Sequence, residues 1–128
     1  MKYNFEKTTE YTFDEAVEKV TEELKKEGFG VLSEIDIHEK LKEKLDIDFR
    51  KYKILGACNP GKAYEALKFE NKIGTMLPCN VIVQELDKGK VEVAAVNPVA
   101  SMLAVDNREL IEVAKEIAEK LQRVINAL

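Results

Sequence analysis

The strongest constraint on this sequence is the segment 53–83, in which two Cys-Asn pairs stand where strand-like stretches end or begin. The first pair lies in Cys58-Asn59-Pro60 and the second in Pro78-Cys79-Asn80. Residues 52–58 are mostly apolar on both faces of an extended chain, which is typical of a central strand. An Asn-Pro pair then indicates a helix start, because the Asn side chain accepts a hydrogen bond from a free amide and a proline at the first helical position loses none. The segment therefore predicts a strand, a helix and a second strand.

The path between the two pairs decides whether they meet. A helix of about twelve residues after Pro60 is about 18 Å long, and the six or so residues of 73–78 can retrace that length at about 3.3 Å each. If the chain returns in this way, the strand that begins at Val81 runs antiparallel to the strand that ends at Cys58, and both thiols lie at one rim. If it crosses at the far end instead, the strands are parallel and the cysteines lie a strand length apart. We expect the return, because Gly74 and Pro78 break up the extended segment 73–78, which has no other evident role.

The rest of the chain supplies further strands and helices. Thr12 and Glu15 form a capping box, the later Asn97-Pro98 repeats the helix-start pair, and Asp106 with Glu109 is expected to cap the last helix. The expected strands are 2–8, 30–37, 52–58, 81–86 and 91–96, of which the last two form a hairpin around 87–90. The expected helices are 12–27, ended by a glycine, then 38–45, 60–71, 97–103 and 106–128.

Apolar stripes indicate how the helices pack. The last helix carries one face of apolar residues over six turns, which are Leu110, Ala114, Ile117, Leu121, Val124 and Leu128. It is expected to pack on the sheet or on its own copy in a second chain. In the short helix 38–45, Leu41 and Leu45 are expected to face inward. The order of elements predicts an α+β fold, with a sheet of about five mostly antiparallel strands and helices packed on one face.

Composition restricts the classes of function. A chain of 128 residues is about the size of one domain, so we expect a single domain over 1–128. Its net charge is −4 and basic residues alternate with acidic ones, which argues against nucleic-acid binding, because a duplex is held by clustered Lys and Arg. The longest uncharged stretch, 93–105, is too short to span a membrane. The first residues do not resemble a signal peptide, so a cytoplasmic location with reduced cysteines is expected.

Cys58 is the first candidate for chemistry. It lies just before an expected helix start, where free amides and the helix dipole favour an anion and would lower the pKa of a thiol. A reactive cysteine needs such a place. The alternative is that Cys58 is a small apolar residue at a strand end, since free cysteine is among the most buried residue types.

If the chain returns, three asparagines are expected to gather near the two cysteines. Asn59, Asn80 and Asn97 would then lie near two helix starts, where backbone amides can hold a carboxylate, a phosphate or another small anion. Alternatively, Cys58 and Cys79 could form a disulfide that closes a loop of about twenty residues, worth about 3 kcal/mol. Each asparagine also has a purely structural alternative, which is capping or turn formation.

Metal and cofactor chemistry have little support in the sequence. His38, Cys58 and Cys79 are the soft ligands, but their spacing matches no metal-binding pattern, so no metal site is expected. His38 shares a helix face with leucines and is expected to be a packed neutral side chain. The sequence has no Walker loop, dinucleotide fingerprint, nucleophile elbow or zinc-protease motif, so no cofactor is expected.

The two motifs also carry a resemblance to a known family. Residues 56–60 (Gly-Ala-Cys-Asn-Pro), Gly74, residues 77–81 (Leu-Pro-Cys-Asn-Val) and Asn97-Pro98 resemble the signature of the bacterial and archaeal domain of unknown function 302 family. The resemblance is strong over 31–98 and weaker over almost the whole chain. It implies a compact α+β domain that forms a homodimer, and it implies no activity.

Three functions are consistent with these observations. The first is a dimeric module that binds a small anion or small molecule at a corner made of Cys58, Asn59, Cys79 and Asn80, with Asn97 nearby. The second is a thiol-redox protein in which Cys58 attacks and Cys79 resolves. The third is a structural dimer in which both motifs only shape turns. None of the three expects a nucleic-acid or membrane partner.

Overall fold

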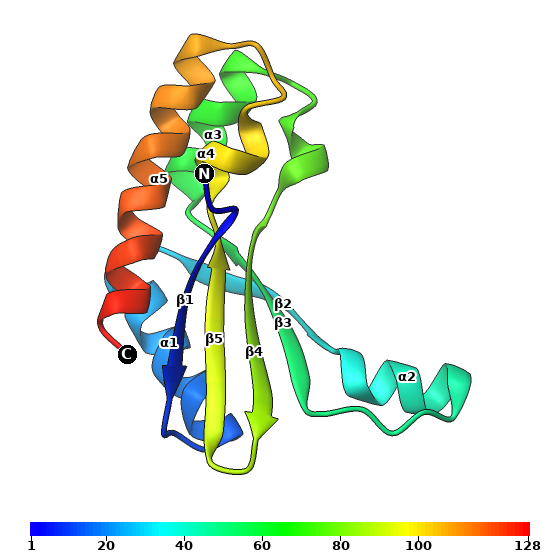
Figure 1. Cartoon of the computed structure of the whole chain (residues 1–128). Coiled ribbons are helices and arrows are strands. Elements are labelled where there is room, and N and C mark those ends of the chain that lie inside the picture. The colour runs from blue at the N-terminus through cyan, green and yellow to red at the C-terminus, as the bar shows by residue number, and fades with distance from the viewer.

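The computed structural model describes residues 1–128 and is built around one five-stranded sheet (Figure 1). The strand order is β1-β5-β4-β3-β2, and all four neighbouring pairs are antiparallel. The predicted α+β class and the five-stranded sheet are therefore confirmed. The strands are β1 (Asn4–Thr9), β2 (Gly30–Asp36), β3 (Tyr52–Cys58), β4 (Cys79–Asp87) and β5 (Lys90–Val96).

Helices α1 and α5 cover one face of the sheet, while α3 and α4 lie beyond one end of the strands (Figure 1). None of the helices is long and apolar enough to cross a membrane. The helices are α1 (Phe13–Lys26), α2 (Ile37–Leu45), α3 (Pro60–Phe69), α4 (Pro98–Met102) and α5 (Arg108–Asn126), with a 3₁₀ turn, η1, at Ile73–Met76.

Side-chain caps begin four of these helices. Thr12 and Glu15 form the predicted capping box, and Asn59 and Asn97 accept hydrogen bonds from the first turns of α3 and α4. The expectation for the last helix was wrong by one residue. Asn107 caps α5, because its side-chain oxygen accepts a hydrogen bond from the backbone N–H of Leu110 at 3.1 Å.

The core lies between the helix-covered face of the sheet and helices α1 and α5. Every second residue of the central strands faces it, as in Leu55 and Ala57 of β3 and Val81 and Val83 of β4. The stripe of α5 packs here as expected for five of its six members, which are Leu110, Ala114, Ile117, Leu121 and Val124. Leu128 is only partly buried. The sheet therefore has one dry face and one open face.

The chain makes the predicted return between the two Cys-Asn pairs. Strand β4 runs antiparallel to β3, and Ala57 lies opposite Cys79 in the register. The returning segment is not fully extended, because it contains η1, and α3 ends at Phe69 rather than near residue 71. Beside this pair, β2 has an irregular register against β3 between Val31 and Ser33.

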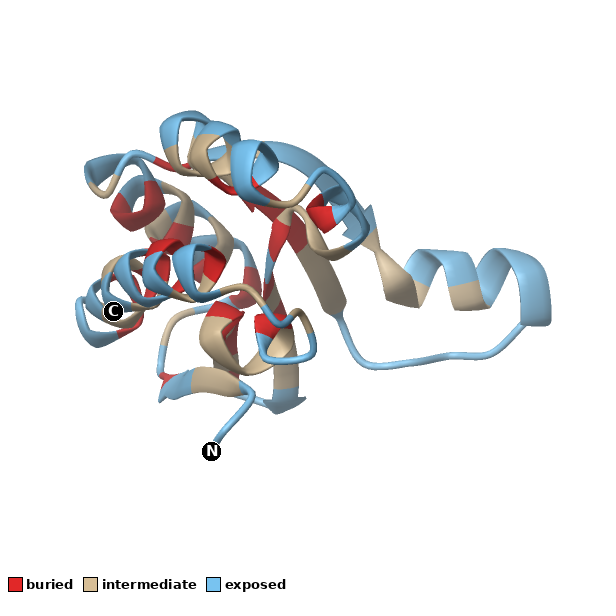
Figure 2. Cartoon of the chain, turned by 90° about the horizontal axis from the view of Figure 1, so that it is seen from above, coloured by how far each residue is buried: buried red, intermediate tan, exposed pale blue.

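Residues 37–51, which we call the arm, project from the body of the molecule (Figures 1 and 2). The arm consists of α2 and the irregular segment that leads to β3. No residue of α2 is buried, and Leu45 is 63% exposed, Ile47 44% and Phe49 39%. The expectation that Leu45 faces inward was wrong, because α2 meets the body of the molecule near its start, at His38, and its other end projects away from it (Figure 1).

Candidate functional site

The two cysteines lie at the same end of two neighbouring strands. Cys58 is the last residue of β3 and is partly exposed, and Cys79 is the first residue of β4 and is buried. Both line a small cavity of about 10 Å³ whose other walls are mostly apolar. A cavity of this size holds at most about one water molecule. The cavity is lined by Phe29, Ala57, Cys58, Asn59, Ala63, Ala66, Leu77, Pro78, Cys79 and Ile117.

Burial controls the chemistry of Cys79. Loss of hydration, and to a smaller degree the nearby Cys58, raise the pKa of the Cys79 thiol to about 11. At neutral pH this thiol is therefore protonated and a poor nucleophile.

Alkylation with iodoacetamide is expected to separate the two thiols. A pKa of about 11 instead of 9.0 lowers the thiolate fraction of Cys79 at pH 8 about 100-fold, and burial also keeps the reagent away. In the native Cys58→Ser variant, Cys79 should be labelled at least about 100-fold more slowly than in urea. Mass spectrometry of the Cys79→Ser variant measures Cys58 separately. Fast native labelling of Cys79, or an internal disulfide under mild oxidant, would instead favour the redox function.

Asn59 and Asn97 are occupied in holding the backbone. Asn59 accepts a hydrogen bond from the N–H of Lys62 and donates one to the carbonyl of Glu27, both at 3.3 Å. Asn97 accepts from the N–H of Val99 at 3.1 Å and donates to the carbonyl of Lys2 at 3.0 Å. Both side chains therefore use their amide nitrogen and oxygen within the fold.

Asn80 lies apart from the other predicted site residues. It pairs with Gly56 in the register and alternates with the buried residues Cys79 and Val81, so it belongs to the open face of the sheet. The structure thus brings Cys58, Asn59 and Cys79 to one small cavity. It leaves Asn80 on the other face and Asn97 at the end of β5.

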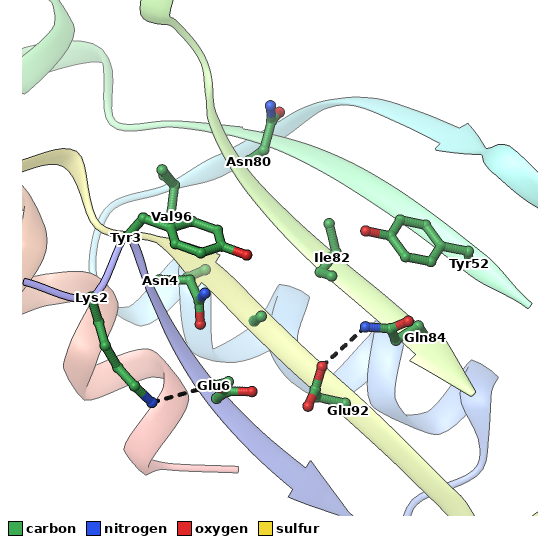
Figure 3. A pocket seen from close by; sticks show the side chains of 12 residues that line it. Lys2, Tyr3, Asn4, Glu6, Tyr52, Asn80, Ile82, Gln84, Glu92 and Val96 are labelled. Atoms are coloured by element: carbon green, nitrogen blue, oxygen red, sulfur yellow. Dashed lines mark hydrogen bonds and ion pairs between the residues drawn. The ribbon is translucent and has the colours of Figure 1, made fainter. Parts of the chain in front are cut away.

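The open face of the sheet carries a much larger hollow of about 540 Å³ (Figure 3). This is within the range of about 300–1,000 Å³ typical of small-molecule sites. Half of its twelve lining residues are hydrophobic, and the strands β1, β5, β4 and β3 all contribute. The lining residues are Lys2, Tyr3, Asn4, Glu6, Tyr52, Asn80, Ile82, Gln84, Glu92, Ala94, Ala95 and Val96.

A short chain of polar side chains crosses this hollow. Gln84 donates through Nε2 to Glu92 Oε1 at 3.0 Å, and its own Oε1 accepts from Arg50 Nε at 2.9 Å. Burial and the neighbouring Glu6 carboxyl group raise the pKa of Glu92, while the hydrogen bond from Gln84 opposes the shift. Glu6 itself pairs with Lys2 at 3.3 Å.

Asn4 is the one residue whose buried side-chain atom lacks a partner. Its Oδ1 accepts no hydrogen bond, while every other buried side-chain nitrogen or oxygen in the chain has a partner. Leaving such an oxygen unpaired costs about 1–3 kcal/mol. Asn4 lines the hollow (Figure 3), and a turn of its side chain would bring this covered oxygen to a bound molecule that donates a hydrogen bond.

Sequence reasoning missed this hollow because it followed the cysteines. A signal was present in the strands 81–86 and 91–96. Their outward positions include Ile82, Ala94 and Val96, although the wet face of an antiparallel sheet is normally polar. An apolar outward face beside Gln84 and Glu92 is typical of a covered or ligand-binding surface.

His38 packs inside the fold rather than at a site. Its Nδ1 accepts a hydrogen bond from the backbone N–H of Tyr52 at 3.0 Å, and its ring meets that of Phe13 edge to face at 6.1 Å between centroids. Nowhere do three His, Cys, Asp or Glu side chains lie close enough together to hold a metal ion.

Comparison with known proteins supports the resemblance carried by the two motifs. The family model described as domain of unknown function DUF302 matches residues 5–128. A crystal structure of an uncharacterized conserved protein DUF302 from Bacillus stearothermophilus is similar over 98% of both chains, with 29% sequence identity and a TM-score of 0.91. No curated protein matches the chain. The match to the family model covers nearly every residue from β1 to the end of α5, and on that basis this chain belongs to the DUF302 family.

Proposed function

We propose that this chain is one protomer of a homodimeric module that binds a small organic molecule in the open-face hollow. The observation that carries the proposal is the hollow of about 540 Å³ beside the buried, unpaired Oδ1 of Asn4. An apolar floor with a few convergent polar groups is what small-molecule sites usually offer. Of the residues that the sequence suggested for binding, Asn80 lies in this hollow.

The cysteine corner supports binding less well. Its cavity of about 10 Å³ is too small for an organic ligand, and the side chain of Asn59 is already bonded twice within the fold. The redox alternative has the two thiols near one another in its favour. Against it stands the protonated state of Cys79, whose pKa is about 11.

The arm supports the dimeric part of the proposal. It presents Leu45, Ile47 and Phe49 to solvent, and its own chain buries none of these three side chains. A twofold contact uses the same patch on both copies, so one such contact would cover both arms at once. We therefore assign the arm to the contact between the two protomers.

A fragment screen with ¹⁵N-labelled protein tests the binding proposal. Hits are expected to shift the amide signals of β1, β4 and β5 on the open face, with saturable binding at millimolar concentration or tighter. Ala94→Phe, which fills the floor of the hollow, should weaken every hit about 10-fold or more, or about 1.4 kcal/mol. Leu103→Phe, at an exposed position that does not line the hollow, is the control.

Two results would contradict the proposal. One is a screen in which no fragment shifts the open-face signals. The other is a set of hits that cluster around Cys58 and Cys79 and do not respond to Ala94→Phe.

A further inference from the structure

Resting on the binding function above, we propose that the hollow takes a small organic cation, an amine carried on an apolar or aromatic body. Three features of the hollow lead to this ligand class. They are the unused acceptor capacity of Glu92, a pair of carboxyl groups on one face, and tyrosine side chains above an apolar floor.

Two side chains of the hollow have acceptor oxygens that the fold does not fully use. Asn4 Oδ1 has no donor, and Glu92 accepts a hydrogen bond from Gln84 and contacts the Glu6 carboxyl group. A carboxylate can accept about four hydrogen bonds, so Glu92 retains most of its capacity. An ammonium group brings up to three donors and no acceptor, which is the complement of this set.

Glu6 and Glu92 lie close together on the open face. In the β1–β5 register, Glu6 is opposite Ala94 and Thr8 is opposite Glu92, so the two glutamates are diagonal neighbours on one face. Two carboxyl groups at this spacing disfavour an anionic ligand and attract a cation.

The protein's own cations leave Glu92 without a salt bridge. Lys2 pairs with Glu6 at 3.3 Å, but its side chain is 77% exposed, so the pair is weak and easily displaced. Arg50 hydrogen-bonds to Gln84 and forms no salt bridge with either glutamate. A ligand cation would therefore meet Glu92 without having to break an ion pair first.

Aromatic and apolar side chains complete the hollow. Tyr3, just before β1, and Tyr52 of β3 both line it, with Ile82 between them on the floor (Figure 3). Tyr3 is 75% exposed, so its ring is free to contact a bound molecule. A cation near a tyrosine face gains about 0.5–1 kcal/mol at exposed sites.

Binding of a cation is expected to depend on pH. The charged and titratable groups that face Glu92 are Glu6 from β1, Lys2 before it, Arg50 from the arm, and Tyr3 and Tyr52, while β4 contributes only the uncharged Asn80 and Gln84. Burial and the Glu6 carboxyl group raise the pKa of Glu92, so it holds its proton to a higher pH than a free glutamate does, and a bound cation favours the ionised form. Affinity should therefore rise as pH increases through the pKa of Glu92 and then level off.

The test compares benzylamine, benzyl alcohol and benzoate, which share one ring and differ in charge, by NMR titration of the whole chain. Benzylamine should shift the open-face signals with an affinity at least about 10-fold above that of benzyl alcohol, and benzoate should not bind. Glu92→Gln should lower the affinity for benzylamine about 10-fold and remove its pH dependence, while benzyl alcohol binds as before. Glu112→Gln, on the outer side of α5, is the matched control.

The outcomes separate this inference from the function on which it rests. If benzoate or benzyl alcohol binds the open face as tightly as benzylamine, the hollow stands as a binding site and the cation class is overturned. Unchanged benzylamine affinity in Glu92→Gln also overturns it. If none of the three compounds shifts the open-face signals, the inference fails, and the fragment screen decides the binding function independently.

Discussion

Replacing both Ile47 and Phe49 with aspartate is expected to convert the proposed dimer into a monomer at micromolar concentration. Both side chains are apolar and exposed in one chain, at 44% and 39%, and both belong to the arm, which projects from the body of the molecule. Two carboxylates placed in an apolar contact must be desolvated without partners. We expect the dissociation constant to rise at least about 100-fold, which is about 2.7 kcal/mol. Sedimentation equilibrium over a range of concentrations measures the change.

The control for this experiment is Leu103→Asp. Leu103 is also apolar and is 56% exposed, but it lies beyond α4 at a distance from the arm. This variant should remain dimeric, and circular dichroism should show that both variants are folded. A wild-type chain that sediments as a monomer, or a double variant that stays dimeric, would refute the role of the arm.

Gly56→Ala is expected to lower the free energy of unfolding by about 2 kcal/mol, within the range typical of overpacked cores. A Cβ at Gly56 would overlap Ser33 Oγ and lie 2.9 Å from Pro78 Cγ. The serine side chain can rotate away, but the proline ring is rigid, so the strands must move. Gly56 is needed because a neighbouring strand and the segment entering β4 approach it closely. Urea unfolding, followed by circular dichroism, measures the effect.

Gly30→Ala provides the comparison for that change. Gly30 lies in β2, the strand next to β3, and a Cβ there would meet no atom within 4 Å. Its stability should change by no more than about 0.5 kcal/mol. Adding Ser33→Ala to Gly56→Ala should restore only the part of the lost free energy of unfolding that comes from overlap with the Ser33 hydroxyl group. Equal stabilities of Gly56→Ala and Gly30→Ala would show that the close contacts of Ser33 and Pro78 with Gly56 do not affect stability.

Much of this fold follows from local patterns in the sequence. The capping residues Thr12, Asn59 and Asn97 are sequence-local devices, so they could be identified before any tertiary contact was known. The return to β4 was also predictable, because the lengths of α3 and of 73–78 allow it. Hairpin β4–β5 follows from its glycine-containing turn.

The site was harder to predict. The sequence alone does not show which face of the sheet a residue joins or which surface a helix packs against. Asn80 directly follows Cys79 in the sequence, but successive residues of a strand face opposite sides, so the two cannot share a pocket within the strand. In α2, the spacing of Leu41 and Leu45 predicts an apolar stripe but does not say which surface covers it. The cap of α5 moved from Asp106 to Asn107 because two neighbouring residues were both able to fill that position.

The irregular register of β2 between Val31 and Ser33 has a consequence for assembly. In a bulged edge strand, the row of free backbone N–H and C=O groups is interrupted at the bulge. Another strand therefore cannot pair with it in continuous register. The same irregularity lies beside the close contact between Ser33 and Gly56, which makes it hard to straighten. The irregularity therefore disfavours extension of the sheet past β2 by a second copy, which helps to protect this side of the molecule from fibrous aggregation.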